Sequence, residues 1–554
     1  RLDETYGDQG EGIARATRLA NLIREYPLEI AERVPYLWLK EDSAAYQLVL
    51  DQLRPDNLLA ILVAMGVKTD LTEKYYGTKY SYHEDAGAAY AALQHPPAVA
   101  SIQLPKPNPF IPATAKVLPV EPVQLINDPA LSLYYAQDVE FQRPMVAEIY
   151  RFRLPRNMAS LENAVLLKFY EACVNESLNE ITYPATLAGL AFTFTADLEG
   201  VKMTLSGYDA SMDRLRDAVT AHIVDFQLSP ERFAALKDRL VRALASFPRS
   251  DAYQIVRESK TAAVREFFYP NAELLPAAQD MTLAAVQAFA HRLFARGKLE
   301  ALVYGNVTGG QAVAAARKFS ATLKTAPVAD TELLRRRLLV TKPGDVVQQT
   351  EKLVGNNSAY WSERILGTDT PEMRAATLAL SNFVDEPYYG SMRTHQQLGY
   401  IVWGGAASDE QTLFAYFIIQ SGDHPADELA ARSDEFIVTL PDQLAALPDD
   451  QWATLIGGVR AQLEEKDKTI AERGARLFDL AYKYSADWNR RDATLAALDQ
   501  LTKARAVEIL RTALSPSTQQ LRAFLGFARQ HEAKTPTAPT FTDREAWKKT
   551  QKFE

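Results

Sequence analysis

The chain contains 554 residues, of which 47% are hydrophobic and 24% are charged, a composition typical of a folded globular protein. Its formal net charge of −9 argues against a nucleic-acid partner. The single cysteine, Cys173, excludes an internal disulfide framework and a cysteine-based zinc cluster. No apolar run is long enough to predict a membrane span, and the length predicts about three or four domains.

The first hundred residues predict helices, a turn and one closing strand. Glu11–Arg24 and Ser43–Leu53 have helical spacing of apolar residues, and Leu58–Met65 is a short apolar run typical of a strand. Tyr75–Thr78 indicates a turn. The chain begins with Arg1 rather than Met, so we expect that this is not the native start. The front strands and the first long helix of the unit that repeats later in the chain are absent here, so we expect the sequence to begin inside such a unit. We therefore predict that residues 1–100 are the tail of a truncated domain.

A proline-rich segment follows. Nine of the 29 prolines fall between Pro96 and Pro129. Such a segment is extended and stiff, and it predicts a connection between domains rather than a loop on one large domain. We place this linker at residues 101–130.

The remaining chain repeats one layout, in residues 131–335 and again in residues 336–554. Each part predicts a strand, a long helix, two strands, further amphipathic helices and a closing strand. The first helix begins at Ser160, a residue suited to an N-cap. We predict an α+β fold of duplicated α/β roll units, each with a mixed sheet and helices packed on one face. Two complete repeats would then follow the tail of a third.

The stretch from Asp385 to Gly405 is the most informative. Pro387 and Gly390 predict an interruption of the second long helix, and Gly399 predicts a left-handed helix end. Arg393 and Tyr400 then lie near one helix–strand junction. A guanidinium and a phenol are hydrogen-bond donors suited to a peptide carbonyl whose oxygen gains charge. From spacing alone, an exposed arginine and a half-buried strand tyrosine are the simpler interpretation.

The two repeats differ at this junction. Six residues before Gly189 of the first repeat lies Tyr183, and one residue after it lies Leu190. The same counts from Gly399 reach Arg393 and Tyr400. Packing alone does not require donors at positions where the sister repeat has Tyr and Leu. This difference favours a functional role for Arg393 and Tyr400.

The same stretch resembles a signature of the insulinase-like family of zinc metallopeptidases, which includes insulin-degrading enzyme and pitrilysin. The family form is Glu-Pro, a short run, then Leu/Met-Arg-Thr-x-x-Gln-Leu-Gly-Tyr-x-Val. The matching residues are Glu386, Pro387, Met392, Arg393, Thr394, Gln397, Leu398, Gly399, Tyr400 and Val402. Tyr75–Thr78 and Pro107–Pro112 resemble the end of the family's second domain and its inter-half linker.

The resemblance implies the C-terminal half of such an enzyme: the end of domain 2 (residues 1–100), the linker (101–130), domain 3 (131–335) and domain 4 (336–554). It implies hydrolysis of peptides inside a closed chamber. Arg393 would hold a substrate carbonyl and Tyr400 would donate to the oxyanion. Tyr389 matches an aromatic position that lines the leaving-group subsite, although the family usually has Phe there.

The family's zinc motif is missing from this sequence. In the family, His-x-x-Glu-His on a helix binds the metal. No two of the seven histidines here lie three to five residues apart, so no helix presents a histidine pair to one metal. We therefore expect no metal ligand in this chain, zinc in the full-length enzyme bound by an N-terminal half, and an inactive fragment.

A second interpretation is a non-catalytic structural or partner-binding subunit related to these peptidases. Retention of Arg393 and Tyr400 argues against it, because a scaffold has no use for them. The expected partners are the N-terminal half, peptide substrates and, as an alternative to a monomer, a second copy in a homodimer. Bacterial relatives favour a periplasmic or secreted location, with the cytoplasm left open.

Overall fold

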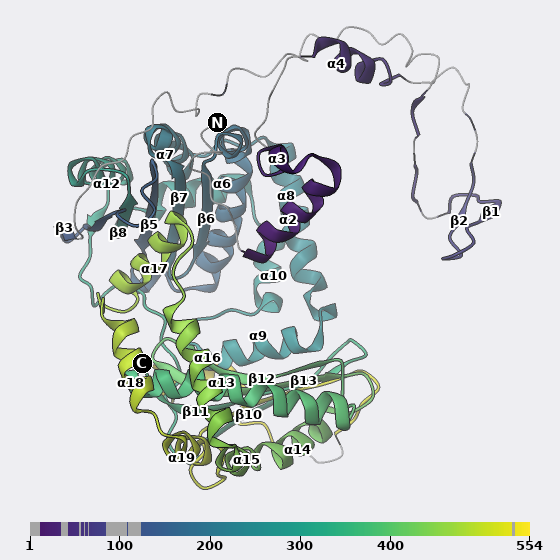
Figure 1. Ribbon diagram of the computed structural model, residues 1–554, viewed down its shortest axis with the longest axis vertical. Helices are drawn as coiled ribbons and strands as arrows, with labels where there is room; N and C mark the ends of the chain where they lie inside the picture. The colour runs from purple at the N-terminus through teal and green to yellow at the C-terminus, as the bar shows by residue number, and fades with distance from the viewer. Residues whose placement is uncertain are drawn as a thin grey trace. The chain divides into compact units, whose positions relative to one another are not determined.

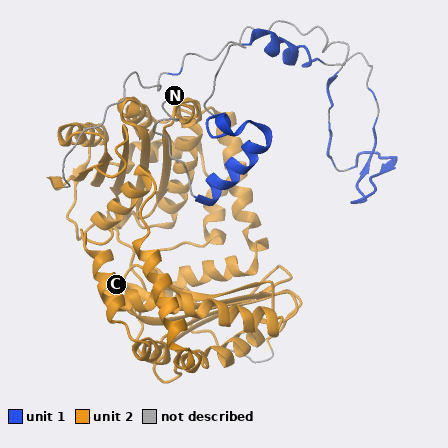
Figure 2. Cartoon of the chain, in the orientation of Figure 1, with its two compact units in different colours: residues 1–108 blue, residues 109–554 orange. Residues whose placement is uncertain are grey.

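The structure is a computed structural model, which forms two compact units, Arg1–Asn108 and Pro109–Glu554 (Figure 2). Each unit is described by itself. The described residues are 12–34, 42–54, 57–59, 61–64, 66–82, 84, 108, 123–533 and 538–554. Most of the predicted linker, residues 101–107 and 109–122, therefore lies outside the described residues. The end of that predicted segment, Val123–Asn127, is a strand.

The first unit contains short elements. They are α2 (Gly12–Glu25), α3 (Leu28–Ala31), α4 (Ser43–Leu50), β1 (Leu71–Thr72) and β2 (Lys79–Tyr80). β1 and β2 form an antiparallel hairpin around the predicted turn, where the Glu73 carboxylate accepts from the backbone N–H groups of Tyr75 and Tyr76, both at 2.7 Å. The strand predicted at Leu58–Met65 is wrong over residues 58–59 and 61–64, which pair with no other strand. A strand needs a neighbour to satisfy its backbone groups, and the apolar run alone does not provide one.

The second unit contains two sheets (Figure 1). Across the seven-stranded sheet lie β3 (Val123–Asn127), β4 (Leu131–Gln137), β8 (Arg296–Gly305), β5 (Met145–Arg153), β7 (Gly200–Tyr208) and β6 (Ala191–Asp197), with β9 (Ala326–Pro327) beside β8. Across the five-stranded sheet lie β10 (Val346–Lys352), β14 (Leu521–Phe527), β11 (Ser358–Thr368), β13 (Thr412–Ser421) and β12 (Ile401–Asp409).

The two sheets share one strand order. β4-β8-β5-β7-β6 in the first corresponds to β10-β14-β11-β13-β12 in the second. In both, the first pair is parallel and the three following pairs are antiparallel. The mixed α/β fold is confirmed, and the shared order is the layout that a duplication requires. The duplication itself stays a prediction.

Helices accompany both sheets. The first half of this unit is residues 123–335, with the seven-stranded sheet, and the second half is residues 336–554, with the five-stranded sheet. The helices of the first half are α6 (Leu161–Leu187), α7 (Asp209–Val224), α8 (Pro230–Ser246), α9 (Ala252–Val264), α10 (Asn271–Gln279), α11 (Leu283–Leu293) and α12 (Gly309–Leu323). Those of the second half are α13 (Pro371–Tyr389), α14 (Ala426–Ile437), α15 (Leu440–Ala446), α16 (Asp449–Glu464), α17 (Ile470–Tyr482), α18 (Arg490–Gln500), α19 (Lys503–Leu514) and α20 (Arg544–Lys548).

Each sheet was predicted to carry helices on one face only. This holds when only the helices from the same half of the unit are counted. Along β5, Glu148 bonds to Arg216 of α7 and Tyr150 packs on Phe319 of α12. Alternate residues of a strand point to opposite faces. The next residue, Arg151, therefore points to the other face. Its guanidinium lies 5.3 Å from the ring centroid of Phe478, which belongs to α17 of the other half. The second face of the first sheet is therefore covered by α17.

The second sheet receives a helix in return. α9 of the first half packs on β11 and β14 (Figure 1), where Lys260 pairs with Glu363 at 3.0 Å. Two glycines allow these close approaches. A Cβ on Gly474 of α17 would lie 2.8 Å from the Ala147 side chain, and one on Gly526 of β14 would lie 2.7 Å from Val256 of α9. We call the reciprocal packing of α9 and α17 the helix exchange.

Candidate functional site

The predicted site lies where α13 passes into β12. Pro387 stands inside α13 and does not interrupt it, so that prediction is wrong. Proline removes only its own N–H, and the helix continues to Tyr389. A π-helical segment, Gly390–His395, follows directly, and the N–H of Gly390 donates to the carbonyls of Glu386 and Pro387. π-helical turns are rare and are frequent at functional sites.

Gly399 is required for a reason other than the one predicted. The left-handed residue of this turn is Gln397, with φ of 53°, not Gly399. A Cβ on Gly399 would lie 2.0 Å from the carbonyl oxygen of Gln420 on the neighbouring strand. The Leu398 N–H donates to the Met392 carbonyl at 2.9 Å and closes the turn. The glycine therefore allows the chain to enter the sheet against β13.

The structure brings Arg393 and Tyr400 together. The Arg393 guanidinium donates from Nη1 to the Gly399 carbonyl at 3.2 Å and lies 4.9 Å from the Tyr400 ring centroid. Tyr400 is 82% exposed. Among the described residues no ion pair joins Arg393 to a carboxylate, and its hydrogen bond to Gly399 leaves most of its five N–H donors free. The pair therefore places a half-buried cation over an exposed phenol at one turn.

Tyr389 lies at the other end of the π-helical segment and is 47% exposed. Its neighbour Tyr388 is fully buried and shares a hydrogen bond of 2.8 Å with Ser433. The α13 end is thus anchored while Tyr389 faces outward. Within the part of the chain that the structure describes, no hydrogen bond or ring contact joins Tyr389 to Arg393 or Tyr400, so its subsite role stays a prediction.

Sequence reasoning missed an aromatic pair close to this turn. Trp403 of β12 is 42% exposed and meets Tyr253 of α9 edge to face, with ring centroids 5.1 Å apart. Tyr253 lies far from Trp403 in the sequence, and only the helix exchange brings them together. Trp403 alone, as a large aromatic on a predicted edge strand, was the available signal.

The sister junction in the first sheet looks different. Gly189 has a left-handed φ of 77°, as a glycine helix end should. Leu190 is 1% exposed, whereas Tyr183 is 69% exposed. The position that holds an exposed phenol in the second sheet therefore holds a buried apolar side chain in the first.

The described residues do not fit a zinc site. No group of three or more His, Cys, Asp or Glu side chains within them is arranged to hold a metal ion. His424 bonds to Glu428 at 3.1 Å and His531 to Ser358 at 2.8 Å, and both lack further ligands. His83 and His95 lie outside the described residues.

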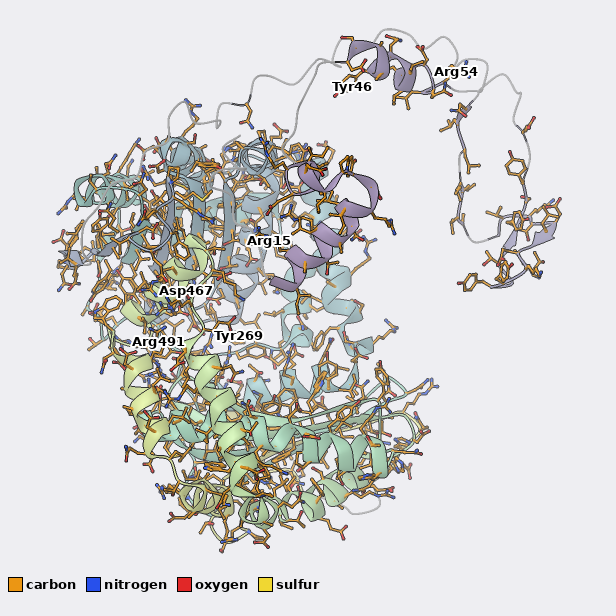
Figure 3. All side chains as sticks on the ribbon, in the orientation of Figure 1. Arg15, Tyr46, Arg54, Tyr269, Asp467 and Arg491 are labelled. Atoms are coloured by element: carbon orange, nitrogen blue, oxygen red, sulfur yellow. The ribbon has the colours of Figure 1, made fainter. Side chains whose placement is uncertain are left out.

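A cluster of charged residues around Asp467 was also missed. The run Glu464–Lys468 predicts only a solvated helix end. In the structure Asp467 accepts from Arg473 at 3.1 Å and from Arg476 at 2.7 Å. Asp467 and Arg491 are labelled in Figure 3 beside α17 and α18. Two arginines, six and nine residues after the aspartate, were the signal.

None of the helices within the described ranges combines the length and the apolar composition needed to cross a bilayer.

Two family models match parts of the sequence. Residues 5–277 match the middle or third domain of peptidase M16, and residues 379–478 match domain 4 of the C-terminal lobe of proteins like the PQQ synthase PqqF. The second match contains the end of α13 from residue 379, the π-helical segment and β12, and so includes Tyr389, Arg393 and Tyr400.

Whole-chain comparisons agree with these matches. Human insulin-degrading enzyme is 27% identical over 515 residues, which are 90% of this chain and 50% of the relative. The chain thus spans about half the length of the curated relatives it matches. The crystal structure of pitrilysin superposes with a TM-score of 0.78 at 20% identity, over 100% of this chain and 60% of pitrilysin. The periplasmic protease PqqL of Escherichia coli gives 0.57 at 13% identity, over 79% of this chain and 50% of PqqL.

Proposed function

The chain belongs to the insulinase-like M16 family of peptidases, and we propose that it acts as the C-terminal half of a zinc endopeptidase of that family. The proposed reaction is hydrolysis of peptides small enough to enter a closed chamber. This half would provide chamber wall and contacts to the substrate and to the transition state. The observation that carries the proposal is the exposed Tyr400 with the Arg393 guanidinium over its ring at one turn.

The chemistry of the pair supports this role. Hydrolysis of a peptide places negative charge on the carbonyl oxygen, and donors fixed in advance stabilise that charge. Tyr400 is a neutral O–H donor that is 82% exposed, so a substrate can reach it. Arg393 is held over the Tyr400 ring and bonds to the Gly399 carbonyl, which fixes its direction before substrate arrives. We assign Arg393 to the substrate carbonyl and Tyr400 to the oxyanion.

The metal is assigned to the other half of the protein. The described residues offer no ligand set, so no step of the reaction is derived through a metal here. In the proposed arrangement, residues 1–100 complete a domain begun in the N-terminal half. Residues 101–130 join the halves, and residues 131–335 and 336–554 form domains 3 and 4. Tyr389, half exposed beside the π-helical segment, would line the leaving-group subsite.

The test compares this chain with its reconstituted enzyme. The purified 554-residue chain is expected to bind no stoichiometric zinc and to cleave no peptide. Addition of the separately expressed N-terminal half is expected to restore chelator-sensitive cleavage. The Arg393→Ala chain should associate with that half but restore much less cleavage. Association without any cleavage by the unaltered chain would favour the non-catalytic interpretation instead.

Location and assembly are parts of the same proposal. A periplasmic or secreted protein fits the likeness in fold to a periplasmic protease, although the fold alone is shared at this level of identity. Cell fractionation of the native protein tests the location. Sedimentation of the purified enzyme distinguishes a monomer from a homodimer.

A further inference from the structure

A cavity of about 740 Å³ lies within the second unit, away from the Arg393–Tyr400 turn. It is lined by β4, α13, β12, α17 and the start of α18, so both sheets contribute to it. Its volume is in the range of small-molecule sites. Much of the wall is apolar, including Tyr134, Leu302, Leu378, Leu413, Leu463 and Leu477. A ligand that fills it must therefore have a substantial apolar part.

Arginines in the same wall exceed the carboxylates that neutralise them. Arg473 and Arg476 share Asp467, at 3.1 and 2.7 Å. Arg491 is near enough to Asp467 to oppose the rise that burial causes in the pKa of that carboxyl, as Arg473 does. Its own contact with Asp492 is long, at 3.6 Å. Glu465, another carboxylate of this wall, pairs with Lys468 at 2.9 Å, so the three arginines face Asp467 and Asp492 and one positive charge is left over, which favours an anionic ligand.

A second pair repeats the arrangement. Arg374 and Arg490 share Asp369, at 2.8 and 2.5 Å. All four of these arginines and Arg491 line the cavity. Sharing one carboxylate between two guanidinium groups leaves donors that another acceptor can use.

One buried polar atom in the wall lacks a partner. Thr377 of α13 is 5% exposed and lines the cavity, and its hydroxyl has no hydrogen-bond partner within the described residues. A buried hydroxyl left without a partner is costly, so an occupant with a polar atom stabilises it. The cavity is therefore more than an apolar void.

The cavity has an accessible side. Trp488 is 49% exposed, Val123 is 54% exposed, and both line the cavity. The Arg491 side chain is 44% exposed. An amphipathic molecule can therefore enter with its apolar end first and leave its charged end beside Arg491.

We propose that this cavity binds an amphipathic carboxylate, with the alkyl chain in the apolar space and the carboxylate beside Arg473, Arg476 and Arg491. Guanidinium groups bind carboxylates through paired, charge-assisted hydrogen bonds, so the head group is selected as well as the tail. This proposal does not depend on the proposed peptidase function.

Titration of the 554-residue chain with straight-chain carboxylates tests the proposal. The fluorescence of Trp488 and calorimetry are suitable readouts, because Trp488 lines the cavity. Affinity is expected to rise about fourfold for each added CH₂ until the cavity is full. Decanol, which has the same tail without the charge, is expected to bind at least tenfold more weakly than decanoate.

Variants separate the cavity from non-specific binding. Ala407 of β12 lines the cavity, and Ala407→Phe is expected to fill part of it and to weaken decanoate binding more than tenfold. Ala191→Phe, on the exposed side of β6, is the matched control and should leave binding unchanged. Arg491→Gln should weaken decanoate but not decanol, whereas Arg511→Gln on α19 should change neither.

Four results would overturn the proposal. The first is the absence of saturable decanoate binding below millimolar concentration. The second is equal binding of decanol and decanoate, which would remove the arginine contact. The third is unchanged binding in a folded Ala407→Phe chain. The fourth is tight binding of pyrophosphate alone, which would identify a simple anion site. Circular dichroism of each variant establishes that it is folded.

Discussion

The helix–strand junctions at Gly189 and Gly399 lie at the same place in two sheets of the same strand order, yet they present opposite chemistry. At the first junction a regular helix end packs Leu190 into the core, where it is 1% exposed. At the second, a π-helical segment and a left-handed Gln397 turn Tyr400 outward until it is 82% exposed. The strand order is thus the same, while the backbone of the turn decides whether a side chain stabilises the core or faces solvent.

The largest expected effect comes from Tyr400→Phe in the full-length enzyme. This change keeps the ring and removes only the O–H donor. Loss of one oxyanion donor lowers kcat by about 10²–10³. Tyr183→Phe at the sister junction is the matched control and should leave kcat unchanged. Single-turnover cleavage of a short peptide measures the chemical step, and unchanged turnover in Tyr400→Phe would refute the assigned role.

Arg393→Ala should differ in kind from Tyr400→Phe. Because Arg393 would hold the substrate carbonyl in the ground state as well, KM should rise while kcat falls. Steady-state kinetics on the same peptide separate the two parameters. A change in kcat with constant KM would assign Arg393 to the transition state alone.

Gly399→Ala tests why the second junction needs its glycine. A Cβ there would lie 2.0 Å from the Gln420 carbonyl oxygen, which belongs to the backbone and cannot rotate away. We expect a loss of about 3 kcal/mol in the free energy of unfolding. Gly390→Ala, with nothing within 4 Å of the added Cβ, should cost almost nothing. Denaturant unfolding of both variants makes the comparison, and equal stability would contradict it.

Glu351→Gln tests the packing of α9 on the second sheet. Burial raises the pKa of Glu351 to about 7, and the Ser259 hydroxyl of α9 donates to it at 2.6 Å. The folded state thus keeps its proton at a pH where the unfolded state has lost it. The contribution of Glu351 to the free energy of unfolding is therefore lost as pH rises from about 4.5 to 7, and this loss is at most about 3 kcal/mol.

The Glu351→Gln chain should lack that part of the pH dependence and should be the more stable of the two at pH 8. Unfolding measured between pH 4.5 and 8 gives the slope. Lys548, whose pKa burial lowers to about 8, titrates at the upper end of this range and does so in both proteins. A slope identical in both proteins would mean that Glu351 is not protonated in the folded state.

The smallest expected effect concerns α17 on the first sheet. A Cβ on Gly474 would lie 2.8 Å from the Ala147 side chain, so Gly474→Ala should shift α17 slightly away from β5. The better helix propensity of Ala offsets part of this, which leaves a loss of about 1 kcal/mol. Gly457→Ala in α16, with open space around it, should instead stabilise by about 0.5–1 kcal/mol.

Local chemistry was predictable from the sequence. Ser160 was identified as an N-cap, and its hydroxyl accepts from the Asn163 N–H at 3.2 Å. Cap chemistry acts within one turn, so a short window of sequence contains all of it. The same argument fails for helix ends that contain proline. α6 runs past Pro184 and α13 past Pro387, because packing along the whole helix outweighs one missing hydrogen bond.

Contacts between distant segments were not predictable in this way. Gly399 was predicted as a left-handed helix end, but the reason for a glycine there is the close approach of Gln420, which belongs to the neighbouring strand β13. The amphipathic pattern of α9 and α17 predicts an apolar stripe without saying which sheet receives it. The association of Arg393 with Tyr400 was within reach, since both flank one turn. The aromatic pair of Trp403 and Tyr253 was not, because it depends on the helix exchange.

The helix exchange also limits how this unit can move. Pulling the two sheets apart would lift α9 from β14 and α17 from β5 together, which exposes Phe478 and the Lys260–Glu363 pair at once. Rotation of one sheet against the other would therefore break packing contacts in two separate places. A peptidase that opens to admit substrate needs a hinge with few contacts across it. In the proposed peptidase we therefore expect such a hinge to lie outside the contact between these two sheets.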